Sequence, residues 1–151
     1  MTSLADVTAK FVEVLLEDDE LETLLGDDPA GDVLVYDRWP VGEHVWLPSV
    51  SVSAVGLVGE VSGLNDGYDG SSRSEWEFPT VQVDVWAAKE ALRDSISEAV
   101  RAALFKGKSE FRSVGVSVDA PTVRPLNEVK PLIFRHSLSY KVFYVLEVAE
   151  A

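Results

Sequence analysis

The strand-like segment near the end of the chain places the strongest constraint on the fold. From Ser137 to Val148 one set of apolar side chains alternates with a second, more polar set, which is the period-two pattern of a β-strand. Alternation over this length predicts a long strand. Because a strand must pair with others and bury its apolar face, the chain is expected to build a sheet covered on at least one side.

Other segments have the spacing of a helix. Residues 87–105 carry apolar side chains at three- and four-residue intervals and are followed by Gly107, which predicts the clearest helix of the chain. An apolar stripe from Leu4 to Leu15 predicts a first helix. Residues 17–25 begin with four acids, continue with leucines and precede Gly26, so they predict a second short helix with acids at the positive end of its dipole.

The predicted order of elements is α-α-β-β-β-α-β-β. We expect an α+β fold in a single domain, residues 1–151, with a mixed or mostly antiparallel sheet and helices on one face. Pro79 indicates an edge strand or a strand beginning, and the serines alternating with apolar residues after Ser49 predict a wet face. Beyond the strand at 137–148, strands are expected at 33–36, 49–57, 75–86 and 111–118.

Two connections are predicted to lie outside regular structure. Residues 59–74 are rich in Gly, Asn, Asp and Ser, which indicates a long loop with a functional role or no fixed structure. Within it, residues 65–70 offer carboxylates that could hold calcium, but the spacing of a calcium loop is missing, so a mobile loop or subunit contact is the preferred interpretation. Residues 119–131 contain three prolines and indicate an extended excursion.

Charge and composition exclude several functions. The 151 residues contain 26 acids and 13 basic residues, a net charge of −13 spread along the length, and such a surface repels phosphate. Two explanations of the acidity stay open: adaptation to multimolar salt in a halophile, or an ordinary acidic cytosolic protein. The sequence has no cysteine, and the N-terminus lacks the pattern of a signal peptide, so we expect a protein kept in the cytoplasm or packaged from there, with no membrane span.

The sequence contains no recognisable catalytic constellation. Only His44 and His136 supply imidazoles, and they lack the spacing of metal ligands. His136 is interpreted as an ordinary residue at the start of a strand. No phosphate-binding glycine loop or nucleophile elbow occurs, so we expect no enzyme activity, no metal and no cofactor.

Aromatic residues in the predicted loops point instead to protein contacts. Four tryptophans are present, and most lie in or beside loops, where they either bind partners or cap the ends of the core. The expected contact regions are residues 59–74 and 119–131. The candidate contact residues are Trp39, Trp46, Tyr68, Trp76, Arg124 and Asn127.

Taken together, the segments resemble the tail-terminator or tail-completion proteins of long-tailed viruses. The resemblance covers most of the length and rests on pattern, with no individually specific motif. It rests on an N-terminal amphipathic segment that ends near Leu24-Leu25-Gly26, a short strand with Val35-Tyr36-Asp37 and a strand entry at 47–52. It also uses residues 81–86, which run directly into the helix, and the final strand with residues 140–144. The loop at 59–74 is longer than the family's strand connection.

This resemblance implies a structural protein of the virion, assembled in the host cytoplasm. It implies a hexameric ring of identical subunits that caps the tail tube, binds the tail-tube protein and the neck or head-completion protein, and meets DNA only transiently through its lumen. With the acidic composition, the source implied is a virus of a halophilic archaeon. The alternatives are a stopper ring of the same kind of particle, or a cytosolic α+β binding module or small enzyme, which would need a concave pocket with convergent polar groups.

Overall fold

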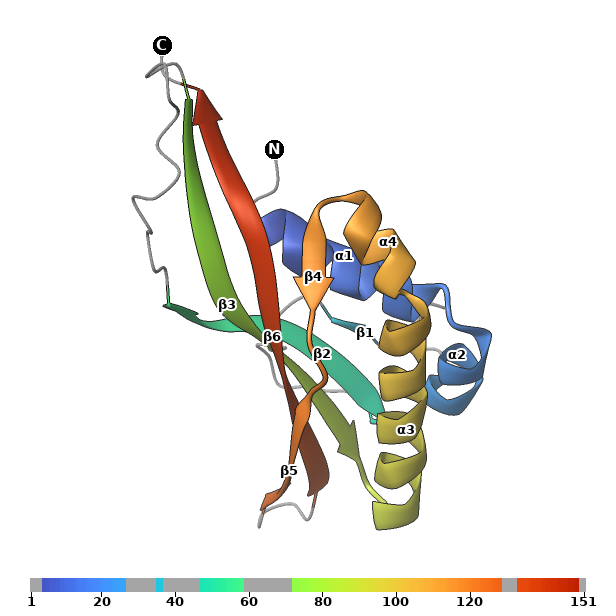
Figure 1. The fold of residues 1–151 in the computed structure, drawn as a ribbon. Helices are drawn as coiled ribbons and strands as arrows, with labels where there is room; N and C mark the ends of the chain where they lie inside the picture. The colour runs from blue at the N-terminus through green and yellow to red at the C-terminus, as the bar shows by residue number, and fades with distance from the viewer. Residues whose placement is uncertain (1–3, 27–34, 37–46, 59–71, 129–132, 150–151) are drawn as a thin grey trace.

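The computed structural model describes residues 4–26, 35–36, 47–58, 72–128 and 133–149. These residues form two helices, three strands, two further helices and three further strands, in that order (Figure 1). No described helix has the length and apolar character needed to cross a bilayer. The helices are α1 (Leu4–Leu16), α2 (Asp19–Leu25), α3 (Glu90–Lys106) and α4 (Lys108–Ser113). The strands are β1 (Val35–Tyr36), β2 (Ser49–Val58), β3 (Ser72–Ala87), β4 (Val116–Val118), β5 (Thr122–Glu128) and β6 (Ile133–Ala149).

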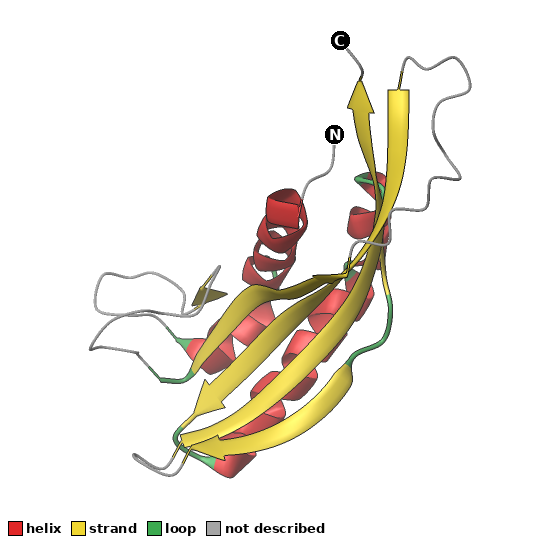
Figure 2. Ribbon diagram, turned by 90° about the vertical axis from the view of Figure 1, so that its left-hand side faces the viewer, coloured by secondary structure: helices red, strands yellow, loops and turns green. Residues whose placement is uncertain are grey.

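The strands form one mixed sheet, mostly antiparallel. Its order is β1-β2-β3-β6, with both β4 and β5 on the far side of β6. Only the described pair β1–β2 is parallel; the other pairs are antiparallel. The helices lie on one face of this sheet, as Figure 2 shows. The predicted α+β fold, with helices on one side of a mostly antiparallel sheet, is confirmed.

The core lies between that face and the helices. Alternate residues of the long strands point into it, among them Val83, Leu138 and Tyr144, and meet Phe11 of α1 and Ile96 of α3. Each fully buried apolar side chain of this size contributes roughly 1.5–3 kcal/mol. The ring of Phe11 lies 4.8 Å from that of Phe111 and 5.8 Å from that of Tyr140, so α1, α4 and β6 share one aromatic cluster.

The helix ends follow the sequence signals. The Asp18 side chain accepts a hydrogen bond of 2.9 Å from the Leu21 N–H and caps α2. The α2 helix stops at Gly26, whose φ of 70° lies in the region that favours glycine. Gly107, which follows α3, allows close packing of α1: a Cβ there would lie 2.6 Å from Cγ1 of Val14, so glycine is required for this approach.

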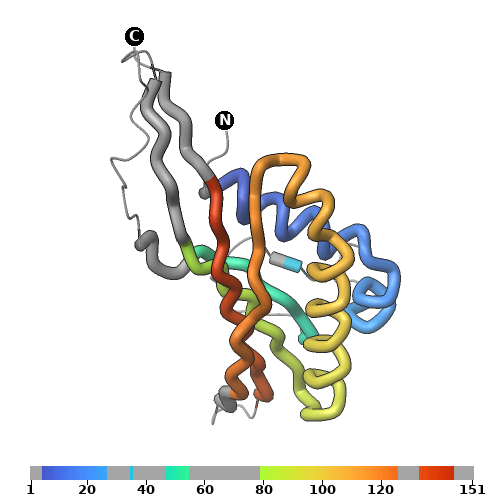
Figure 3. Tube along the Cα trace, viewed as in Figure 1, coloured from blue at the N-terminus to red at the C-terminus, as the bar shows by residue number. Residues whose placement is uncertain are grey.

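The segment predicted as a strand at 111–118 is mostly not a strand. The helix α4 follows α3 directly, visible in the Cα trace of Figure 3, and β4 is confined to Val116–Val118. Phe111 is almost fully buried against the ring of Phe11, and burial of this one ring stabilises the short helix. Gly115, with φ of 79°, then turns the chain into β4.

The connection at 119–131 also differs from the prediction, because β5 occupies Thr122–Glu128. β4 and β5 form one interrupted edge strand along β6: Val118 is opposite Val142, and Thr122 is opposite Ser139. Four steps on the edge therefore match three on β6, which makes a bulge. The Asp119 N–H still donates to the Lys141 carbonyl at 3.0 Å, so the edge stays attached at the bulge.

Two predictions about β2 and β3 are wrong. Ser49 and Ser51 are buried, because the large side chain of Trp86 packs beside them and its indole N–H donates to the Ser51 hydroxyl at 3.4 Å. Pro79 lies inside a central strand between β2 and β6. It is tolerated because the facing part of β2 has a bulge between Val55 and Leu57, where ladder hydrogen bonds are already interrupted.

The ends of β3 and β6 form a ribbon of two strands. Residues 72–77 pair with 144–149, whereas the described partners of β3 in β2 begin only at Phe78 and those of β6 in β4 stop at Tyr144. The ribbon extends past the helices in Figure 1. It also takes in Ser72–Ser74, which the sequence had indicated as loop; the rest of that loop lies outside the described residues. A two-stranded ribbon is marginally stable in isolation, so a partner is expected to stabilise it.

Candidate assembly surfaces

The face of the sheet opposite the helices carries mostly polar side chains. The strand register sets four of them in a row across the sheet: Ser51 opposite Asp84, Asp84 opposite Ser137, and Ser137 opposite Arg124. We call this surface the polar face. Its other described members include Ser49, Ser53, Thr80, Gln82, Trp86, Thr122, Leu126, Arg135, Ser139 and Lys141.

An ion pair lies at the centre of the polar face. Asp84 is 2% exposed and accepts from Nε of Arg135 at 3.2 Å and from its Nη2 at 3.0 Å. The Gln82 amide approaches both carboxylate oxygens, at 2.9 and 2.8 Å. The guanidinium also stacks 4.5 Å from the Trp86 ring. The buried carboxylate is therefore fully hydrogen-bonded, which is the condition for keeping a charge out of water.

The edge strand β5 offers free backbone groups for pairing. It pairs with β6 on one side, and among the described strands none lies on its other side. Arg124 is exposed here, and Asn127 lies further along the same strand, opposite Phe134. The structure therefore brings these two predicted contact residues onto one open edge, where another chain could add a strand.

The other predicted contact residues do not join them. Trp76 lies in the two-stranded ribbon, where it is paired with Val145 of β6. The open edge at β5 pairs with the other end of β6, at residues 133–139. Trp39, Trp46 and Tyr68 fall outside the described residues. Of the four tryptophans, Trp86 is buried on the polar face, against Ser51 and Arg135.

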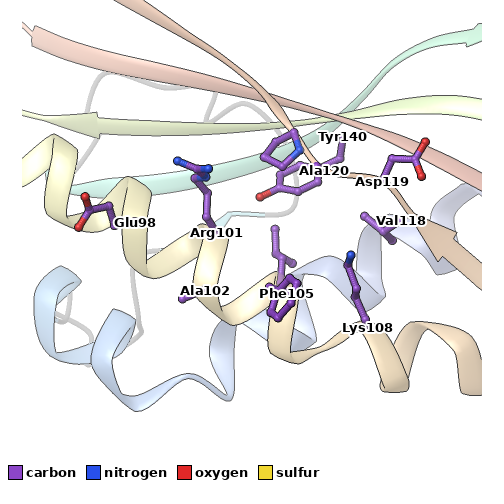
Figure 4. A pocket seen from close by; sticks show the side chains of 11 residues that line it. Glu98, Arg101, Ala102, Phe105, Lys108, Val118, Asp119, Ala120 and Tyr140 are labelled. Carbon is purple, nitrogen blue, oxygen red and sulfur yellow. The ribbon is translucent and has the colours of Figure 1, made fainter.

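A cavity of about 400 Å³ lies between α3 and the start of the excursion at 119 (Figure 4). We call it the α3 pocket. Phe105 stands at its side and is 70% exposed, with the Lys108 ammonium 5.0 Å from its ring centroid. The pocket was not predicted, since its walls come from segments far apart in the sequence. They include Glu98, Arg101, Ala102, Val118, Asp119, Ala120, Pro121 and Tyr140.

Tyr140 gives the α3 pocket an unusual polar group. The residue is 3% exposed, and its hydroxyl has no hydrogen-bond partner among the described residues. Burial raises the pKa of this phenol, and the positive charge of Arg101 only partly opposes the rise. A buried hydroxyl without a partner costs about 1–3 kcal/mol. The phenol therefore stays neutral and has a proton to donate to an acceptor.

His136 lies where the sequence placed it, near the start of β6, on the helix side. Its Nε2 is 3.5 Å from the Asp94 carboxylate, and its Nδ1 is buried with no partner among the described residues. Burial, helped by the Arg93 charge, lowers the pKa of this imidazole, while Asp94 and Glu90 act in the opposite direction. The ring is neutral at physiological pH. Among the described residues, no group of three or more His, Cys, Asp or Glu side chains could hold a metal ion.

Comparison with solved structures shows a likeness in fold. No protein-family model matches the sequence, and no curated protein matches it significantly. A solved structure described as "Virion of native gene transfer agent (GTA) particle" contains a chain of the same fold, with a TM-score of 0.59 and 16% sequence identity. The match covers 93% of this chain and 95% of that chain. At this identity the likeness establishes a shared α+β fold over nearly the full length of both chains.

Proposed function

We propose that this chain is a structural, non-enzymatic protein of a virus-like particle, in which copies form a ring that caps the tail tube and joins the tail to the head or neck. The observation that carries the proposal is the shared fold with a chain of a gene transfer agent virion, aligned over 93% of this chain and 95% of that one. The resemblance of the sequence pattern to tail-terminator proteins points in the same direction and suggests six subunits.

The surfaces support self-assembly. A closed ring needs a heterologous interface, in which one patch of each subunit binds a different patch of the next. The open edge at β5 and the ribbon formed by β3 and β6 are such different patches. The seven residues of β5 are about 24 Å long at 3.4 Å per residue, enough for several main-chain hydrogen bonds with a neighbour.

The charge agrees with a role beside DNA that does not involve tight binding. A net charge of −13 repels the phosphate backbone, so DNA passing through an acidic lumen would not adhere. The partners proposed are further copies of the chain, the tail-tube protein and the neck or head-completion protein, within the virion of a halophilic host.

A stopper ring of the same kind of particle is the first alternative, because it would use the same surfaces. Binding partners separate the two: a terminator binds tail-tube protein and limits tube length, whereas a stopper binds the portal-adaptor complex and retains packaged DNA. A small binding protein is the second alternative, favoured by the α3 pocket, whose volume of about 400 Å³ lies in the range of small-molecule sites.

The decisive experiment measures assembly and partner binding together. The purified chain is analysed by native mass spectrometry in high and low salt, then mixed with polymerising tail-tube protein. Arg124→Glu places a repulsive charge on the open edge and is expected to weaken the ring, whereas Arg112→Glu changes an exposed arginine of α4 and serves as the matched control. A chain that remains monomeric within intact particles, or that turns over a small substrate, would refute the proposal.

A further inference from the structure

We propose that the α3 pocket is a docking site for a carboxylate-bearing segment of a second copy of this chain. The inference rests on the proposed ring and names one of its contacts. It arises from three features of the pocket: a large exposed aromatic ring, a buried hydroxyl without a partner, and two cations that form no ion pair among the described residues.

The apolar part of the site is Phe105. At 70% exposure it is by far the most exposed of the large apolar side chains described; Leu16 and Val114, at 42%, come next. A ring in this position removes apolar surface from water only when another molecule covers it. Lys108 lies over the ring and leaves its ammonium at the rim, available to an anion.

The polar part of the site combines the carboxylates of Glu98 and Asp119 with donors that have no ion pair or hydrogen bond among the described residues. Tyr140 lines the pocket, and its buried hydroxyl can satisfy its hydrogen bond only with an acceptor brought from outside the described residues. Arg101 lies close enough for its charge to act on that phenol, and Figure 4 shows its side chain on the same side of the pocket. A carboxylate is the group that accepts from a phenol and a guanidinium together.

Charge complementarity identifies the occupant as a second copy. The chain has 26 acidic residues against 13 basic ones, so almost any surface that a neighbouring copy presents carries carboxylates. Arg101 and Lys108 form no ion pair among the described residues, although Glu98 and Asp119 line the same pocket, so both cations can bind a carboxylate of an acidic neighbour. The pocket is also continuous with the open edge, because its wall at Asp119 and Pro121 leads directly into β5.

Three variants test the site, so that the conclusion does not depend on one substitution that could disturb folding. Tyr140→Phe removes only the hydroxyl, Phe105→Ser removes the exposed ring, and Arg101→Gln removes one cation. Arg112→Gln is the matched control, since it neutralises an exposed arginine outside the pocket. Thermal unfolding of each variant checks folding, and sedimentation velocity at several protein concentrations gives the association constant between copies.

We expect Tyr140→Phe to leave thermal stability equal or higher, since a costly buried hydroxyl is removed, while association weakens about tenfold. Arg101→Gln and Phe105→Ser should weaken association about ten- to a hundredfold, and Arg112→Gln by less than about twofold. Loss of thermal stability in Tyr140→Phe with unchanged association would mean a structural role for the hydroxyl and would overturn the inference.

The remaining outcomes separate this site from the proposed function. If the unmodified chain forms rings and all three variants form them equally well, the docking inference fails and the ring proposal stands. If the variants still form rings but no longer bind tail-tube protein, the occupant is a different virion protein and the second-copy assignment is wrong. If the unmodified chain does not associate at all, even with tube protein present, the proposed function itself fails.

Discussion

Replacing Arg135 by Met should lower the free energy of unfolding, because the substitution breaks the ion pair with Asp84 on the polar face. The substitution keeps an unbranched side chain over the Trp86 ring but removes both N–H donors to Asp84. Among the described residues, the Asp84 carboxylate, with its side chain 3% exposed, would then depend on Gln82 alone. Breaking a buried ion pair by removing one partner costs roughly 3–5 kcal/mol.

The lower end of that range applies here, because Arg135 is 17% exposed and water can partly replace it. We therefore expect a loss of about 3 kcal/mol, which for a chain of this length lowers the melting temperature by roughly 6–12 °C. The double variant Asp84→Asn/Arg135→Met removes both charges and should recover most of the loss, ending within about 1 kcal/mol of the unmodified protein.

Urea unfolding followed by circular dichroism measures these differences, with the protein dilute and the concentration fixed so that association does not contribute. Lys141→Met is the control: Lys141 lies on the same strand and the same face but is exposed, so its loss should change the free energy of unfolding by less than about 0.5 kcal/mol. If Arg135→Met is no more destabilising than Lys141→Met, or if the double variant is as unstable as the single one, the ion pair does not stabilise the sheet as argued.

Three further measurements test other contacts. Gly107→Ala should cost about 1–3 kcal/mol through the clash with Val14, and adding Val14→Ala should relieve part of the strain, read from thermal unfolding. Because the pKa of His136 is lower in the folded state, stability should fall as pH drops below about 6.5, and His136→Gln should flatten that dependence; an unchanged slope would contradict it. If the acidity is an adaptation to high salt, transfer from multimolar to dilute salt should lower the unfolding temperature markedly; no change would favour an ordinary acidic protein.

Hydrophobic periodicity in the sequence correctly predicted the long elements, whose own residues carry a clear strand or helix pattern. The period of two before Val148 and the helical stripe before Gly107 both correspond to long elements of the fold, β6 and α3. The short helix α4 was missed because its only buried apolar residue, Phe111, is stabilised by Phe11 a hundred residues earlier. Strand β5 was missed because proline argues against a central strand, whereas an edge strand tolerates it.

The candidate surfaces were less predictable than the fold. Asp84 and Arg135 are 51 positions apart, and only the register of β3 against β6 brings them together. The same is true of the α3 pocket, whose cations and phenol come from α3, α4 and β6. Arg124 and Asn127 were predicted as contact residues from their place in a proline-rich excursion, and their role in contacts stays a prediction.

The bulge between β4 and β5 affects what the free subunit can do before it meets its partners. A long straight edge would let copies stack without limit into fibres. Here the bulge at Asp119 separates β4 from the seven residues of β5, and Pro125 has no N–H to donate, so an incoming strand can extend only along β5. Growth along this edge is therefore discouraged unless a neighbour arrives with a matching shape, and such selectivity is what a particle with a fixed number of parts requires.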